Sequence, residues 1–164
     1  MATADESLRL LISNLITTHT IELRLAGRQR DEVLHELVAK VPEIANRPDA
    51  RQTLLRALQE REQLHSTGIG DGVALPHARH ALVGLVHKPV IVFGRHDRGV
   101  PYGSIDAQPV RLFFLLVTTT VTQHLQILAR ISRLVRDQKL RQSLSTADRP
   151  ETVIQLIREA EAKM

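Results

Sequence analysis

Residues 61–80 read REQLHSTGIGDGVALPHARH, and the character of the chain changes within this segment. Three of its residues, at 68, 70 and 72, are glycines, and a proline follows at 76. Glycine adopts backbone conformations that other residues reach only with strain, so this composition predicts a shaped loop over 65–80. Inside the loop, the apolar residues 73–75 predict a short strand.

The residues before this loop carry mostly helical patterns. Apolar side chains three and four positions apart predict helices over 6–15, 28–41 and 49–63. Between the first two helices, apolar and polar residues alternate, which predicts a short strand over 18–25. The apolar positions of the three helices are Leu8, Leu11, Ile12 and Leu15, then Val33, Leu34, Leu37 and Val38, then Leu54, Leu55 and Leu58.

Strands come first after the loop. Compact apolar runs predict strands over 89–94 and 110–117, and the residues between them, 96–109, predict a turn-rich connection. Helical spacing then resumes, and Asp148 is the expected N-cap of the last helix, with Pro150 in its first turn. The helices expected in this part of the chain cover 122–136, 137–144 and 150–162.

The order of these elements indicates the fold class. Helices and strands are intermixed without strict strand–helix alternation, which predicts an α/β fold with a mixed β-sheet flanked by helices on both faces. The length of 164 residues predicts a single domain. A domain of this size buries roughly 70% of the surface that its unfolded chain exposes, enough for a core without disulfides or metals.

Composition excludes several classes of protein. Hydrophobic residues make up 43% of the chain and charged residues 24%, a balance that excludes a disordered tail. The absence of cysteine excludes a disulfide scaffold, a thiolate metal site and a cysteine nucleophile. No apolar run approaches the ~18 residues of a membrane helix, and the N-terminus lacks the layout of a signal peptide. We therefore expect a cytoplasmic protein without membrane insertion.

The charge of the chain is basic. Its formal net charge is +4 and its sequence pI is near 10.1. However, the arginines are spread from Arg9 to Arg158 among acidic residues, and aromatic residues, which stack on bases, are only 2% of the chain. We therefore expect no nucleic-acid partner. An attraction for anionic partners or phosphate groups is the alternative interpretation of the charge.

The glycine segment does not match the common nucleotide, hydrolase or metal motifs. It lacks the Gly-Lys-Ser/Thr ending of a P-loop, and the chain has no Gly-x-Ser-x-Gly elbow. His77, His80 and His124 are three conceivable zinc ligands, but no carboxylate or cysteine falls at ligand spacing. We therefore expect no metal and no cofactor.

The seventeen residues Arg61–His77 resemble the active-site signature of enzyme IIA of the fructose/mannitol type. This family belongs to the bacterial phosphoenolpyruvate-dependent phosphotransferase system and includes a nitrogen-regulatory branch. The resemblance lies in Arg-Glu, then Ser-Thr-Gly-x-Gly-x-Gly, then Ala-x-Pro-His, without a gap. It implies an enzyme IIA-like domain over 6–160. Downstream matches are Ile105-Asp106, Pro109-Val110, the strand at 112–117 and Gln123-His124-Leu125.

The resemblance also implies roles for particular residues. It identifies His77 as the phosphorylated histidine, Arg61 as an arginine that contacts the phosphoryl group, and His124 as a second active-site histidine. His124 would bind phosphate by donating a hydrogen bond to the same oxygens, or it would modulate the charge on His77. Neutral imidazole is a competent nucleophile near pH 7, and arginine offers phosphate oxygens a permanently charged fork of donors. The backbone N–H groups of the glycine loop are further candidate donors. The supporting loop consists of Ser66, Thr67, Gly68 and Gly70.

The family resemblance predicts a phosphoryl carrier that accepts phosphate from an HPr-type phosphocarrier protein. Two outlets remain open: regulatory target proteins, as in the nitrogen-type branch, or a IIB domain that serves sugar uptake. A phosphotransfer-silent binding module is the further alternative. It is suggested by Ala78, where the family usually has glycine, and by Thr118–Thr120, where a proline is frequent. No role is matched for three other histidines, which we interpret as surface residues: His65, His80 and His96.

Overall fold

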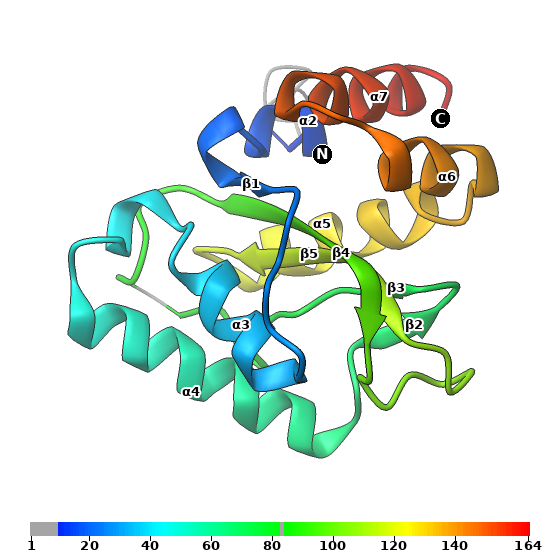
Figure 1. Ribbon diagram of the computed structural model, residues 1–164. Helices are drawn as coiled ribbons and strands as arrows, with labels where there is room; N and C mark the ends of the chain where they lie inside the picture. The colour runs from blue at the N-terminus through cyan, green and yellow to red at the C-terminus, as the bar shows by residue number, and fades with distance from the viewer. Residues whose placement is uncertain (1–9, 83) are drawn as a thin grey trace.

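The computed structural model describes residues 10–82 and 84–164 (Figure 1). Six α-helices and two short 3₁₀ turns are found in these residues, together with five strands. The helical elements are α2 (Ile12–Leu15), η1 (Thr18–Thr20), α3 (Arg30–Val38), η2 (Pro42–Ile44), α4 (Pro48–Leu64), α5 (Val121–Leu134), α6 (Gln138–Thr146) and α7 (Pro150–Ala162). The strands are β1 (Ile21–Glu22), β2 (Gly68–Gly70), β3 (Val73–Ala74), β4 (Val90–Val100) and β5 (Val110–Val117).

The strands form one mixed sheet in the order β1-β4-β5-β3-β2. β4 and β5 are its long antiparallel centre, with Phe93 opposite Phe114. β1 runs parallel to β4, β3 runs parallel to β5, and β2 turns back antiparallel on β3. The predicted α/β fold with a mixed sheet is therefore confirmed.

Helices cover both faces of this sheet, as predicted. Successive side chains of a strand point to opposite faces, so β4 and β5, which are apolar on both faces, supply two cores. Val92 and Phe113 belong to the core shared with α3 and α4. Ile91, Phe93 and Phe114 belong to the core shared with α2, α5, α6 and α7. Figure 1 shows α3 and α4 on one side of the sheet, and α2, α6 and α7 on the other.

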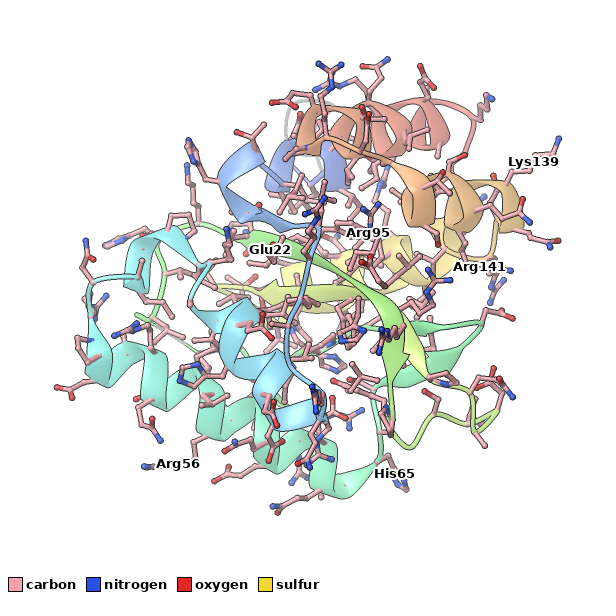
Figure 2. The ribbon with its side chains drawn as sticks, in the orientation of Figure 1. Glu22, Arg56, His65, Arg95, Lys139 and Arg141 are labelled. Carbon is pink, nitrogen blue, oxygen red and sulfur yellow. The ribbon has the colours of Figure 1, made fainter. Side chains whose placement is uncertain are left out.

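Polar side chains join the outer elements. Glu161 of α7 is buried, and its carboxylate accepts the backbone N–H groups of Ile12 at 2.7 Å and Ser13 at 2.8 Å, which holds α2 against α7. Arg130 of α5 donates to the same carboxylate at 3.1 Å. Arg95 of β4, labelled in Figure 2, donates from Nη1 to the carbonyl of Leu144 at 3.0 Å and so holds the end of α6.

Most predicted helices are confirmed, with shifted ends. The helix expected over 28–41 covers only Arg30–Val38, because the chain turns into η2 at Pro42. Of the helix expected over 6–15, only Ile12–Leu15 is found, and positions 6–9 lie outside the described residues. Asp148 as N-cap is wrong: Arg149 holds that position, and Pro150 begins α7.

The strand predictions need larger corrections. The strand expected over 18–25 is reduced to β1, because the side chain of Thr20 closes a turn on Thr17 instead. The turn-rich connection expected over 96–109 starts late, since β4 continues to Val100 through an irregularity in its pairing with β5. β2 is a strand inside the predicted loop that the sequence pattern does not indicate.

No helix in the described part of the chain is long and apolar enough to cross a membrane.

Candidate functional site

His77 lies at the edge of the sheet where β3 and β5 end. It pairs with Leu116 in an isolated parallel bridge, and the N–H of Leu116 donates to the carbonyl of Pro76 at 2.9 Å. Because β3 and β5 run parallel, their carboxyl ends meet at one edge of the sheet. His77 is therefore held beside the last residues of β5, from which the chain continues to α5.

The ring of His77 is oriented by the backbone. Its Nδ1 lies 2.6 Å from the carbonyl oxygen of Leu75, and a carbonyl only accepts hydrogen bonds, so Nδ1 carries the proton. In the neutral ring Nε2 then keeps its lone pair. Burial lowers the pKa of His77 and the charge of Arg61 lowers it further, although the hydrogen bond to Leu75 acts in the opposite direction. His77 is therefore neutral at pH 7.

His124 is the second histidine of this edge. It lies on the first turn of α5, whose N-cap Thr120 accepts the N–H of Gln123. The centroids of the His77 and His124 rings are 5.2 Å apart, and the rings are tilted by 60°. The Nδ1 of His124 lies 3.1 Å from the hydroxyl of Thr118. Burial, with smaller effects of His77 and His80, lowers the pKa of His124 to about 4.

Arg61 supplies the positive charge of the site. It lies on the last turn of α4, and its Nη1 donates to the carbonyl of His65 at 2.6 Å. This bond folds the arginine over the end of the helix, near the exposed His65 labelled in Figure 2. The guanidinium is near enough to act on the pKa of His77. The structure thus brings the rings of His77 and His124 together, with Arg61 at the end of α4 acting on His77 through its charge.

The glycine segment is a tight hairpin made of β2 and β3. Gly70, Asp71 and Gly72 have φ angles of 96°, 57° and 77°, in the left-handed region that favours glycine. A Cβ at Gly68 would overlap the hydroxyl of Ser104, so glycine is also needed for close packing there. The tip is held from outside by Asp106, whose Oδ2 accepts the N–H of Asp71 at 3.0 Å.

The polar groups of the supporting loop bond within the protein. The hydroxyl of Ser66 donates to the carbonyl of Tyr102 at 2.7 Å and accepts the N–H of Gly68 at 3.0 Å. The N–H and hydroxyl of Thr67 both donate to the carboxylate of Glu62. These two amides therefore have protein partners, and the loop shapes the site rather than offering those groups to an anion.

Three residues that contribute to the site were given no role from the sequence. Glu62 and Tyr102 form a buried polar cluster with Thr67, and Thr118 contacts His124. For Glu62 a signal was present: it lies four residues after Leu58, on the apolar stripe of α4. An acidic residue on such a stripe indicates a buried, hydrogen-bonded carboxylate.

The residues that departed from the family pattern fit without strain. Among the described residues the only non-glycine positions with positive φ are Asp71 and Ala107, so Ala78 needs no left-handed conformation. Ala78 is buried next to the site. Of the unmatched histidines, His65 and His80 are exposed, as predicted. His96 is half-buried, and its Nδ1 accepts the N–H of Gly99 at 3.0 Å.

Within residues 10–82 and 84–164, no three side chains of His, Asp and Glu are grouped as they would be around a metal ion.

The fold and the histidine pair define a small α/β domain with a paired-histidine site at a sheet edge, and comparison with known proteins identifies its family. The family model "Phosphoenolpyruvate-dependent sugar phosphotransferase system, EIIA 2" matches residues 14–160. The chain belongs to this family. Members are components of phosphotransferases.

Relatives come from both branches of the family. The chain is 35% identical over 135 residues to a nitrogen regulatory protein of Bradyrhizobium diazoefficiens, covering 81% of this chain and 85% of that protein. It is 37% identical over 148 residues to the fructose-specific EIIABC component of Bacillus subtilis, covering 89% of this chain but only 23% of that protein. The crystal structure of IIA-Ntr from Neisseria meningitidis superposes with a TM-score of 0.77 at 28% identity, covering 90% of this chain and 99% of that one.

The lowered pKa of His124 makes a prediction about stability. The unfolded chain binds a proton on this residue near pH 6.5, whereas the folded chain binds it only near pH 4. Between these values the unfolded state holds more protons, so the free energy of unfolding should fall as the pH is lowered. Urea unfolding across this range should show a flatter pH dependence for His124→Asn. An equal slope in both proteins would contradict the assigned pKa.

Proposed function

We propose that the chain, as a domain over residues 6–160, carries a phosphoryl group on Nε2 of His77, accepted from an HPr-type phosphocarrier protein in the cytoplasm. The observation that carries this proposal is the bond between Nδ1 and the carbonyl of Leu75, which leaves the lone pair on Nε2. That lone pair attacks the phosphorus, the bond from phosphorus to the donor breaks, and the donor keeps its electron pair. Delivery of the phosphoryl group to an acceptor reverses this step. Neither a metal nor a cofactor takes part in the step as written.

Arg61 and His124 have complementary roles in this proposal. Phosphoryl transfer needs alignment and stabilisation of charge on the phosphoryl oxygens. The guanidinium of Arg61 is always charged and has donors beyond the one bonded to His65. His124 is neutral at pH 7 and carries a single N–H. When the hydroxyl of Thr118 donates to Nδ1, that N–H is on Nε2 and donates to a phosphoryl oxygen.

Exposed apolar side chains near the site support a protein as the donor. Of the large hydrophobic side chains that are exposed in the described residues, all but Met164 lie on segments beside the site. Ile105, on the loop between β4 and β5, is 87% exposed. Protein interfaces are built on such side chains, surrounded by polar ones. We propose that the HPr-type phosphocarrier docks on this surface, formed by Leu64, Ile69, Ile105, Val121 and Leu125.

Of the two possible roles of the phosphorylated chain, we propose the regulatory one. The phosphorylation state of His77 changes binding to regulatory target proteins, as in a nitrogen-type IIA. Support comes from the likeness to nitrogen regulatory proteins over most of both chains. The second candidate is a sugar-specific IIA that passes the phosphoryl group to a IIB domain, and it is supported by the identity to the fructose-specific relative.

Labelling tests whether His77 accepts the phosphoryl group. With phosphoenolpyruvate, enzyme I and an HPr-type phosphocarrier, the wild-type chain should gain an acid-labile phosphate, because phosphohistidine is acid-labile. His77→Ala should gain none, whereas His35→Ala, on an exposed histidine of α3, should label normally. Full labelling of His77→Ala would refute the site. Failure of the wild type to label, with partner binding intact, would favour the phosphotransfer-silent binding module.

The role of Arg61 is tested by the rate of the same reaction. Arg61→Ala removes the charge facing the phosphoryl oxygens, and loss of one such donor costs about 10²-fold or more in rate. Rapid-quench measurement should show this loss, while far-UV circular dichroism shows an intact fold. Arg56→Ala, on the outer face of α4 (Figure 2), is the matched control. A normal rate in Arg61→Ala would remove Arg61 from the site.

The outlet is tested by adding acceptors to the phosphorylated chain. A regulatory IIA should keep its phosphate when mixed with a fructose-type or mannitol-type IIB domain, because it is not built to dock on them. Loss of the label to either IIB domain at a rate comparable to its loading would establish the sugar-specific alternative.

A further inference from the structure

Glu62 is a buried carboxylate next to the proposed phosphoryl-transfer site. The residue is 5% exposed and precedes the end of α4 by two positions. Its Oε2 accepts the N–H of Thr67 at 3.0 Å, and its Oε1 accepts the hydroxyl groups of Thr67 and of Tyr102, the latter at 2.9 Å. A buried charge is costly unless hydrogen bonds compensate it, and these donors provide that compensation.

A series of hydrogen bonds connects this carboxylate with the ring of His77. Glu62 accepts the N–H of Thr67, and the carbonyl of Thr67 accepts the N–H of Leu75 at 3.0 Å. The carbonyl of Leu75 then accepts Nδ1–H of His77 at 2.6 Å. Thr67 and Leu75 are both 3% exposed, so these hydrogen bonds are shielded from water. Displacement of Thr67 therefore displaces the carbonyl that orients the ring.

The same carboxylate holds the loop that follows β4. Tyr102 donates its hydroxyl to Glu62, and its backbone carbonyl accepts the hydroxyl of Ser66. The ring of Tyr102 packs edge-on against Phe113 of β5, with centroids 5.7 Å apart. Glu62 thus joins three segments: the end of α4, the glycine hairpin and the loop that carries Ile105.

We propose that Glu62 is a positioning residue of the phosphoryl-transfer site. It sets the orientation and the tautomer of the His77 ring through Thr67 and Leu75, without touching the phosphoryl group. This inference rests on the proposed function of His77 as phosphoryl acceptor. A misplacement of about 1 Å at a reacting atom costs up to ~10²-fold in rate, so a group three hydrogen bonds away is expected to affect the chemical step.

Glu161 provides the matched control. It is also a buried carboxylate that accepts backbone N–H groups, but it joins α7 to α2 through Ile12 and Ser13, and to Arg130 near the C-terminal end of α5. Glu62→Gln and Glu161→Gln make the same chemical change, and both are expected to lower the melting temperature. Only Glu62→Gln is expected to alter the site.

The first measurement is the tautomer of His77, read from the ¹⁵N shifts of its ring at a pH above its pKa. In the wild type we expect Nδ1 protonated and Nε2 unprotonated. In Glu62→Gln the population with Nε2 protonated should rise, whereas Glu161→Gln should match the wild type. Thr67→Val, which removes one donor to Glu62 at nearly constant shape, should shift the tautomer in the same direction. Thr67→Ser, which restores that hydroxyl, should not.

The second measurement is the transfer rate from a phosphorylated HPr-type phosphocarrier. We expect kcat of Glu62→Gln to fall by about tenfold with a smaller change in KM, because alignment rather than docking is impaired. Glu161→Gln should stay near the wild type at a temperature where both variants are folded.

A wild-type tautomer together with a wild-type kcat in Glu62→Gln would overturn the proposal, as would equal losses in both glutamine variants. If Glu62→Gln does not fold, the comparison of Thr67→Val with Thr67→Ser decides the question. If the wild type accepts no phosphate, the proposed function fails, while the tautomer comparison still tests whether Glu62 positions the ring.

Discussion

The parallel pairing of β3 with β5 is the constraint on which the site depends. The pairing continues past the end of β3 as the bridge between His77 and Leu116. His77 therefore lies at the carboxyl end of β5. The chain leaving β5 enters α5, whose first turn carries His124. The rings of His77 and His124 are far apart in sequence, and this pairing is what brings them close in space. The core strands therefore fix the relative position of the two histidines at their edge.

Burial and nearby charges both lower the pKa values of His77 and His124. Removal from water disfavours the charged imidazolium, and it is the largest cause of the lowered pKa of both His77 and His124. Arg61 acts on His77 in the same sense, because a nearby positive charge opposes protonation. The site therefore keeps its two histidines neutral beside a positive charge. In the proposed function, the neutral ring of His77 attacks phosphorus, and the positive charge stabilises the transferred phosphate.

The glycine hairpin contributes shape more than donors. Gly68 lets the hairpin pack closely on Ser104, and Gly70 and Gly72 supply the left-handed turn at its tip. The amides of Thr67 and Gly68 are used by Glu62 and Ser66. The hairpin thus leads the chain to His77, and the buried carboxylate of Glu62 accepts two hydrogen bonds from Thr67 at its start.

The sequence by itself determined the core helices and the presence of the two central strands, and it named the candidate site residues. Local patterns suffice for these, because apolar spacing reports which face is buried and the string Arg61–His77 resembles the active-site signature of one family. The lengths of β1, β2 and β4 were decided only by tertiary structure, because strand pairing depends on partners that are distant in the chain. The same holds for the site: the distance from His77 to His124 and the burial of Glu62 follow from how β3, β5 and α4 pack. A hydrogen bond between residues such as Glu62 and Tyr102 leaves no periodic trace in the sequence, since its energy depends on a desolvated environment that only the complete fold creates.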